Sequence, residues 1–115
     1  MQISVRTVML ANGTSLPLQG TQFEFLPPSM FPNGAYVEFA TLADATGVLR
    51  TVQTGGDIVE EESPVNIGTI NVQPVYPDNF TLNDNVGPGE RINLKLRDTS
   101  GVARTVITMV RFTPL

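Results

Sequence analysis

Glycine and proline are scattered among short segments of strand-forming residues, and this spacing constrains the fold more than any other feature of the sequence. The 115 residues include ten glycines and nine prolines, more than the roughly 12% that average usage gives. They interrupt the apolar segments without a regular period, so the chain must turn often. The pattern predicts an all-β protein.

Eight segments are expected to be strands. The first places Ile3, Val5 and Met9 on one face. The segment 35–43 would also suit one side of a short helix, but the β-rich segment 47–53 follows at hairpin distance and favours a strand. The expected strands are 1–10, 21–26, 35–43, 47–53, 65–73, 80–82, 90–98 and 102–113.

Two segments between these strands are expected to be loops. Residues 27–34 contain three prolines, which cannot donate to a strand ladder and which fix φ, so this loop should be rigid and hold Met30 and Phe31 in place. Residues 83–89 combine Asn, Asp, Gly and Pro, a composition typical of turns.

The length fits one domain over residues 1–115, since a chain of this size can bury roughly two thirds of its unfolded surface. Hydrophobic residues make up 41% and charged residues 16%, a balance typical of globular proteins. Sequence alone leaves the strand order open. We therefore expect a single antiparallel β-sandwich, jelly-roll-like or Ig-like, or else a small barrel of about eight short strands.

A turn sequence occurs twice in the chain. Residues 44–52, Asp-Ala-Thr-Gly-Val-Leu-Arg-Thr-Val, return as residues 98–106, Asp-Thr-Ser-Gly-Val-Ala-Arg-Thr-Val. Asp is favoured at the first position of a type I turn, and Gly at the fourth can adopt the left-handed conformation of a bulge. We expect two look-alike hairpins. They either share a common turn by chance or form a pseudo-symmetric pair.

The second hairpin has a definite expected register. A three-residue loop that pairs Asp98 with Val102 separates apolar from polar residues, with Leu94 inward, Lys95 outward and Gly101 at positive φ. The expected inward residues are Ile92, Leu94, Leu96, Val106, Val110 and Phe112, and the expected outward residues are Arg91, Asn93, Lys95, Arg97 and Thr105. The first hairpin is apolar on both sides, so another part of the chain or a neighbouring subunit should cover it twice.

The sequence contains no cysteine and no histidine. Without them there are no disulfides, no thiolate or imidazole metal ligands and no His-based catalytic machinery. We therefore expect a protein that is not an enzyme, with no catalytic, cofactor-binding or metal-binding residues. A net charge of −4 argues against a nucleic-acid partner. No stretch reaches the ~18 apolar residues of a membrane span, and the N-terminus lacks a leader pattern, so a soluble, unprocessed chain is expected.

Charged and amide side chains gather in three places. The run Glu60-Glu61-Glu62 is expected to be a solvated loop, although it could attract a cation or a basic partner. Asp78, Asn79, Asn83, Asp84 and Asn85 fit turns, and whether they bind a cation stays open. Five of the seven basic residues lie in the last hairpin, where they either form a solvated face or steer subunits together head to tail. These five are Arg91, Lys95, Arg97, Arg104 and Arg111.

The chain has one lysine, many prolines and glycines, and strand patterning throughout. It ends with a basic strand pair whose last residues are Arg-Phe-Thr-Pro-Leu at 111–115. In these respects it resembles small phage virion proteins of the capsid decoration, cement or minor head type. The resemblance implies a structural protein of the virion, assembled in the host cytoplasm, that stabilises a shell by forming homo-oligomers such as trimers or pentamers. It also implies a larger capsid protein as partner. Without that resemblance, a soluble cytoplasmic protein is expected.

Apolar residues in loops and tails often mark an interface. The interface candidates are Met30, Phe31, Pro32, Phe112, Thr113, Pro114 and Leu115. The alternative function is a ligand-binding or carbohydrate-binding β-sandwich module, and a His-free hydrolase ranks third.

Overall fold

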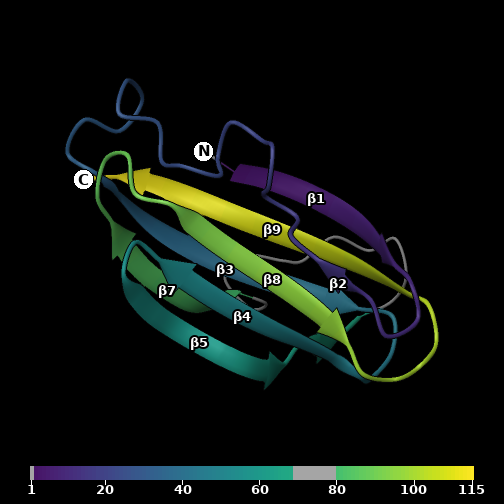
Figure 1. The fold of residues 1–115 in the computed structure, drawn as a ribbon. Coiled ribbons are helices and arrows are strands. Elements are labelled where there is room, and N and C mark those ends of the chain that lie inside the picture. Colours follow the sequence, from purple (N-terminus) through teal and green to yellow (C-terminus); the bar gives the residue numbers. More distant parts are fainter. Residues whose placement is uncertain (1, 69–79) are drawn as a thin grey trace.

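The computed structural model describes residues 2–68 and 80–115, and these residues form strands and turns. Figure 1 shows two sheets that pack face to face, which confirms the all-β prediction and is compatible with a β-sandwich; the sheets do not close into a barrel. The strands are β1 (Gln2–Met9), β2 (Thr14–Ser15), β3 (Ala35–Ala43), β4 (Val48–Thr54), β5 (Asp57–Pro64), β6 (Asn66–Ile67), β7 (Phe80–Val86), β8 (Ile92–Asp98) and β9 (Arg104–Pro114).

Sheet A has the order β1-β9-β3, and both β7 and the short β6 pair with the other edge of β3. Sheet B has the order β2-β8-β4-β5. All described pairings are antiparallel except that of β3 with β6. No helix in the described ranges is long and apolar enough to cross a membrane.

The two repeated turns do not form hairpins. Residues 44–47 lead from β3 in sheet A to β4 in sheet B, and residues 99–103 lead from β8 in sheet B back to β9 in sheet A. Each turn is therefore an arch between the sheets, and β3 pairs with β9 while β4 pairs with β8. The predicted pairing of Asp98 with Val102 is wrong, because Asp98 pairs with Val48. In an arch, as in a hairpin, the apolar face of each strand is turned toward the core. The alternation of apolar and polar residues along the strands is therefore consistent with both.

The two arches contact each other. The backbone nitrogen and the Oγ1 of Thr99 both donate to the carbonyl of Gly47, at 2.7 Å each. Gly47 has a φ of 109°, and a Cβ there would lie 2.6 Å from the Cβ of Ser100, so this position favours glycine on both counts. Gly101 has the predicted positive φ, 76°. We call the end of the molecule formed by residues 10–13, 44–47 and 99–103 the arch end.

The core lies between the sheets and is richest in aromatic residues at the opposite end. Along β8 the burial alternates, with Leu94 inward and Lys95 outward as predicted. Phe112 of β9 stacks on Phe23 and Phe31, with ring centroids 4.9 and 5.7 Å apart. We call this end, formed by residues 27–34, 87–90 and 113–115, the loop end. All six residues expected inward on the last two strands are buried: Ile92, Leu94, Leu96, Val106, Val110 and Phe112.

The expectation that both β3 and β4 are covered on two sides is met only by β3. Phe39 faces the core, and Ala40 and Leu42 on the opposite face of β3 are also buried. In β4 burial alternates, and outward residues such as Thr51 are half-buried. The outer face of sheet B is therefore open to contacts.

Three expected segments differ in the structure. Residues 21–26 are mainly turns and contribute one isolated bridge, between Phe25 and Arg91. The acidic run 60–62 and the segment 83–86, both expected as loops, belong to β5 and β7. Charges and Asx residues are tolerated there because both strands lie at sheet edges, where one side of the backbone faces away from the ladder. Of the expected strand 65–73, residues 66 and 67 form β6, and 69–73 lie outside the described residues, as do Asp78 and Asn79.

Candidate interaction surfaces

The two segments that hold the predicted interface residues meet at the loop end. The backbone nitrogen of Leu115 donates to the carbonyl of Gly34 at 3.1 Å, and Ala35 pairs with Pro114. The exposed candidates are Met30 (41% exposed), Pro32, Thr113, Pro114 and Leu115 (58%). Phe31 and Phe112 are 3% and 1% exposed, so they belong to the core and have no side-chain surface to offer a partner. Contact of the five exposed residues with a partner stays a prediction.

The proline-rich loop holds Met30 outward because Phe31 anchors it. The backbone nitrogens of Met30 and Phe31 both donate to the carbonyl of Pro27, at 3.2 and 3.0 Å, and that of Gly34 donates to Phe31 at 3.1 Å. Gly34 has a φ of 90°, and a Cβ there would lie 2.5 Å from the carbonyl oxygen of Val86. The loop is therefore built around one buried ring.

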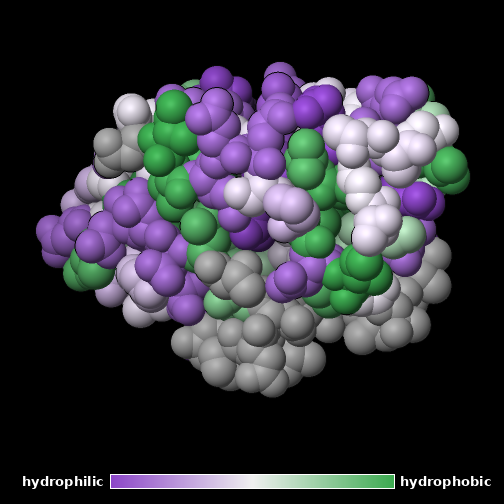
Figure 2. Space-filling view, turned by 90° about the horizontal axis from the view of Figure 1, so that it is seen from below, coloured by the Kyte–Doolittle hydropathy of each residue, from purple (hydrophilic) through white to green (hydrophobic). Residues whose placement is uncertain are grey.

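A second group of exposed apolar side chains lies at the arch end and was missed from the sequence. Val8, Leu10 and Val102 are 67%, 77% and 54% exposed. Pairing of β1 with β9 joins Val8 to Thr105 and so brings the residues beyond these strand ends together. The sequence signal was weak, because Val8 and Leu10 belong to an apolar segment expected to be a strand, and Val102 begins another such segment. Figure 2, the view from below, shows hydrophobic residues in separate small areas among hydrophilic ones.

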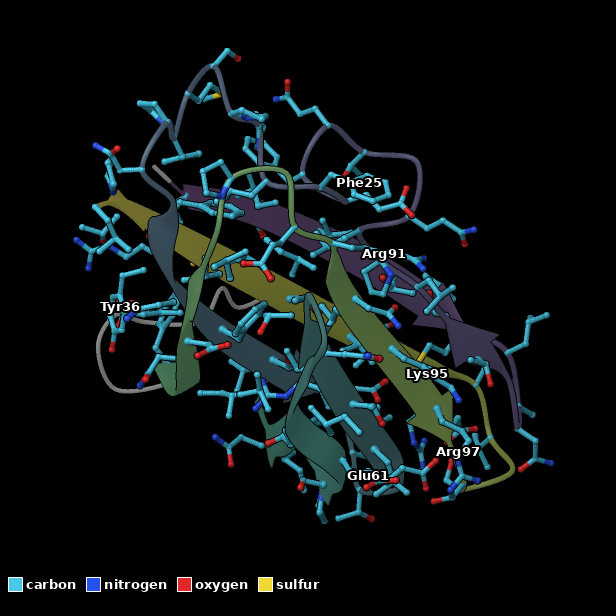
Figure 3. The ribbon with its side chains drawn as sticks, turned by 60° about the vertical axis from the view of Figure 1, so that its left-hand side comes forward. Phe25, Tyr36, Glu61, Arg91, Lys95 and Arg97 are labelled. Atoms are coloured by element: carbon cyan, nitrogen blue, oxygen red, sulfur yellow. The ribbon has the colours of Figure 1, made fainter. Side chains whose placement is uncertain are left out.

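The outer face of sheet B carries charged residues in rows. Figure 3 shows Arg91, Lys95 and Arg97 following one another along β8, with Glu61 on the β5 side of the sheet. Arg97 reaches across β4 to Glu62, with Nε–Oε1 and Nη2–Oε2 distances of 3.1 and 2.5 Å. These hydrogen bonds, with the charges of Arg97 and Lys95, lower the pKa of Glu62; in turn, the hydrogen bond with Glu62 raises the pKa of Arg97.

The five basic residues of the C-terminal segment do not share one face. Arg104 and Arg111 are on β9 in sheet A, whereas the other three are on or next to β8 in sheet B. The prediction that the five residues lie together in one hairpin is therefore wrong, because the segment forms an arch between the two sheets.

The acidic run is also not a solvated loop. Glu60 faces the interior, where it accepts hydrogen bonds from Nε and Nη2 of Arg50 at 2.6 and 3.2 Å. Nη1 of Arg50 donates to Oγ1 of Thr41 in the opposite sheet at 3.1 Å, so this side chain, 6% exposed, links the two sheets. Thr108 pairs across the strand with Thr41, and its buried Oγ1 has no hydrogen-bond partner in the described structure.

Asp98 joins the β1–β2 turn to the second arch. Its carboxylate accepts hydrogen bonds from the backbone nitrogen and Oγ of Ser100, at 2.9 and 2.7 Å, and from the backbone nitrogen of Asn12 at 3.0 Å. Asn12 has a φ of 56°, which this bond helps to hold. The hydrogen bonds with Ser100, more than that with Asn12 or the charge of Arg104, lower the pKa of Asp98.

Asp98 should make the stability of the protein depend on pH in acid. A carboxyl group whose pKa is lower in the folded state stabilises fully above its unfolded pKa, near 3.9, and loses this effect as the pH falls through the folded pKa. We expect Asp98→Asn to unfold at lower urea concentration at pH 7, and to lose less stability than the parent as the pH falls below about 4. Urea titrations at several pH values measure this. Glu61→Gln is the control, and equal pH slopes for Asp98→Asn and the parent would contradict the role of Asp98.

The described residues contain no group of three or more His, Cys, Asp or Glu side chains that could hold a metal ion. Comparison of the chain with protein-family models, curated proteins and solved structures finds no match. The described surface carries exposed apolar side chains toward its two ends and one face of mixed charge.

Proposed function

We propose that this chain is a non-enzymatic assembly protein that forms homo-oligomers and stabilises a larger protein shell, as a capsid decoration, cement or minor head component of a virion. The observation that carries the proposal is that exposed apolar side chains lie in the segments at both ends of the sandwich. Single exposed apolar residues are ordinary, but grouped ones mark interaction sites. Met30 and Leu115 lie in the two segments that meet at the loop end, and Leu10 and Val102 lie in the arch end, with Val8 near the end of β1.

The loop end is the surface proposed for the shell partner. Its contact residues are held by prolines, by the buried ring of Phe31 and by the bond between Leu115 and Gly34. A surface ordered before binding loses little conformational entropy when it binds, which suits a protein that must hold a shell together. The jelly-roll-like or Ig-like type of the sandwich, and location in the virion, are parts of this same proposal.

The test uses the untagged chain in lysates of its source, because Leu115 is part of the loop end and a tag beside it would cover this surface. On a density gradient probed with antiserum, the chain should sediment with large protein shells. Met30→Ser combined with Leu115→Ser should lower the shell-bound fraction at least tenfold, since each buried apolar side chain contributes about 1.5–3 kcal/mol and tenfold is about 1.4 kcal/mol.

Gln22→Ala changes an exposed polar residue outside both apolar groups and serves as the control. Both variants should keep the thermal midpoint of the parent, because the altered side chains are exposed. A chain that stays in the slow fractions, or a double variant that sediments like the parent, would overturn the proposal.

A further inference from the structure

The outer face of sheet B has opposite charges on the two sides of its central strand β4. Basic side chains accompany β8 on one side, and acidic side chains accompany β5 on the other. They face outward because Leu94 and Leu96 of β8, and Glu60 of β5, face the interior. The outward basic residues are Arg91, Lys95 and Arg97, and the outward acidic residues are Glu61 and Glu62.

Some of these charges are already paired within the chain, and two are not. Arg97 pairs with Glu62, and Arg91 pairs with Glu24. Among the residues that the structure describes, neither Lys95 nor Glu61 forms an ion pair. Lys95 of β8 is directly opposite Thr51 of β4. On the other side of β4, the neighbours of Thr51 pair with Ser63 and Glu60 of β5. Residues 61 and 62 therefore lie in a bulge of β5 beside Thr51. Lys95 and Glu61 therefore lie at the same level of the sheet.

We propose that two copies of this chain pack through the outer faces of sheet B about a two-fold axis parallel to β4, so that Lys95 of each copy meets Glu61 of the other. A rotation about that axis exchanges the two sides of β4 and places β8 of one copy over β5 of the second. A two-fold axis across the strands would instead place β8 over β8 and oppose like charges. Charge complementarity selects the first arrangement.

Apolar residues at the margins of the face fit the same arrangement. Phe25, 54% exposed, lies beyond β8, where it pairs with Arg91. Ile58, 64% exposed, lies on β5 opposite Gln53. Both are toward the loop end of the face but on opposite sides of β4, so the rotation brings Phe25 of one copy toward Ile58 of the other. Aromatic residues are enriched at protein interfaces, so Phe25 suits the part of an anchor there.

The size of the face predicts a weak contact. Four strands about 4.8 Å apart and seven residues at about 3.3 Å each give a footprint of roughly 450 Å² per copy, below the ~800 Å² per partner of a standard stable interface. We therefore expect a reversible dimer that dissociates at high salt, where exposed ion pairs are screened. This inference rests on the homo-oligomer part of the proposed function, and it gives two copies where the virion resemblance implies three or five.

Light scattering after size-exclusion chromatography at low salt tests the dimer. The mass should rise with protein concentration from 12.4 kDa toward about 25 kDa, twice that value. Lys95→Glu and Glu61→Lys should each weaken the dimer about tenfold or more, because the two-fold axis makes each substitution oppose like charges twice. The combined variant Lys95→Glu/Glu61→Lys should recover the parent behaviour. Arg6→Glu makes the same change in net charge as Lys95→Glu, but on β1, outside this face, and should leave the dimer unchanged.

The results of this experiment distinguish failure of the proposed dimer interface from failure of the proposed function. Oligomers that Lys95→Glu, Glu61→Lys and Arg6→Glu affect alike, or a combined variant that does not recover, overturn this interface and leave homo-oligomerisation standing. A parent chain that stays at 12.4 kDa at all concentrations overturns the interface and the homo-oligomer part of the proposed function together. Binding to shells through the loop end is decided by the gradient experiment alone.

Discussion

Replacing Phe112 by alanine will lower the free energy of unfolding by about 3–5 kcal/mol. Phe112 is 1% exposed and stacks on both Phe23 and Phe31, so truncation removes buried apolar area and leaves a cavity that the surrounding strands can fill only in part. Native domains are stable by about 5–15 kcal/mol, and the loss would therefore be a large share of the total. Urea unfolding followed by circular dichroism measures it.

Phe25→Ala is the matched control for this substitution. It removes the same side chain from a position that is 54% exposed, so it should cost far less stability. Phe112→Leu should lie between the two, since it keeps part of the buried volume. Equal losses for Phe112→Ala and Phe25→Ala would show that the aromatic cluster does not hold the two sheets together.

Replacing Arg50 by alanine should cost about 3 kcal/mol, the lower end of the range for breaking a buried ion pair. The substitution leaves the carboxylate of Glu60, in a side chain only 16% exposed, without its cation, and it leaves Thr41 without its donor. A charge held in a mostly apolar interior without a partner is strongly unfavourable. Denaturant unfolding at neutral pH gives the value.

The combined variant Arg50→Met/Glu60→Leu distinguishes loss of the pair from loss of packing. Replacing both members of a buried ion pair by apolar residues of similar size is often neutral or stabilising. We expect this variant to recover most of the loss, while Arg97→Ala on the exposed face should have a smaller effect than Arg50→Ala. A combined variant as unstable as Arg50→Ala would mean that the loss comes from the ion pair and hydrogen bonds of Arg50 themselves, and not from leaving the charge of Glu60 unpaired.

Several local features follow from the sequence because they depend on near neighbours. The alternation of Leu94 and Lys95 follows from the period of a strand, and Gly101 at positive φ follows from turn chemistry. Strand positions such as β1, β3, β4, β8 and β9 were predicted within a few residues. The pattern at 35–43 suited a strand or a short helix, and the β-rich neighbouring segment favoured the strand that the structure has, although the two segments form an arch and not the expected hairpin.

For the interface candidates, the sequence did not predict which side chains are exposed and which are buried. Met30 and Phe31 are adjacent apolar residues in one proline-rich loop, yet Met30 is exposed and Phe31 is buried against Phe112. No local pattern separates the two residues, because the burial of Phe31 depends on its contact with Phe112 of β9, a strand that is distant in the sequence. The meeting of this loop with Leu115 likewise required the pairing of β3 with β9.

The repeated turn shows which features the local sequence determined and which only the tertiary structure decided. Sequence by itself determined the Asp and Gly turn chemistry and the apolar face of each flanking strand, because these depend on a few consecutive residues. Only the tertiary structure decided that the strands on either side of each turn separate into opposite sheets, that the two arches stack through Gly47 and Thr99, and that Glu60 pairs with Arg50 inside. The physical reason is that a hairpin and an arch bury the same alternating residues, and the choice between them rests on pairings made by distant segments.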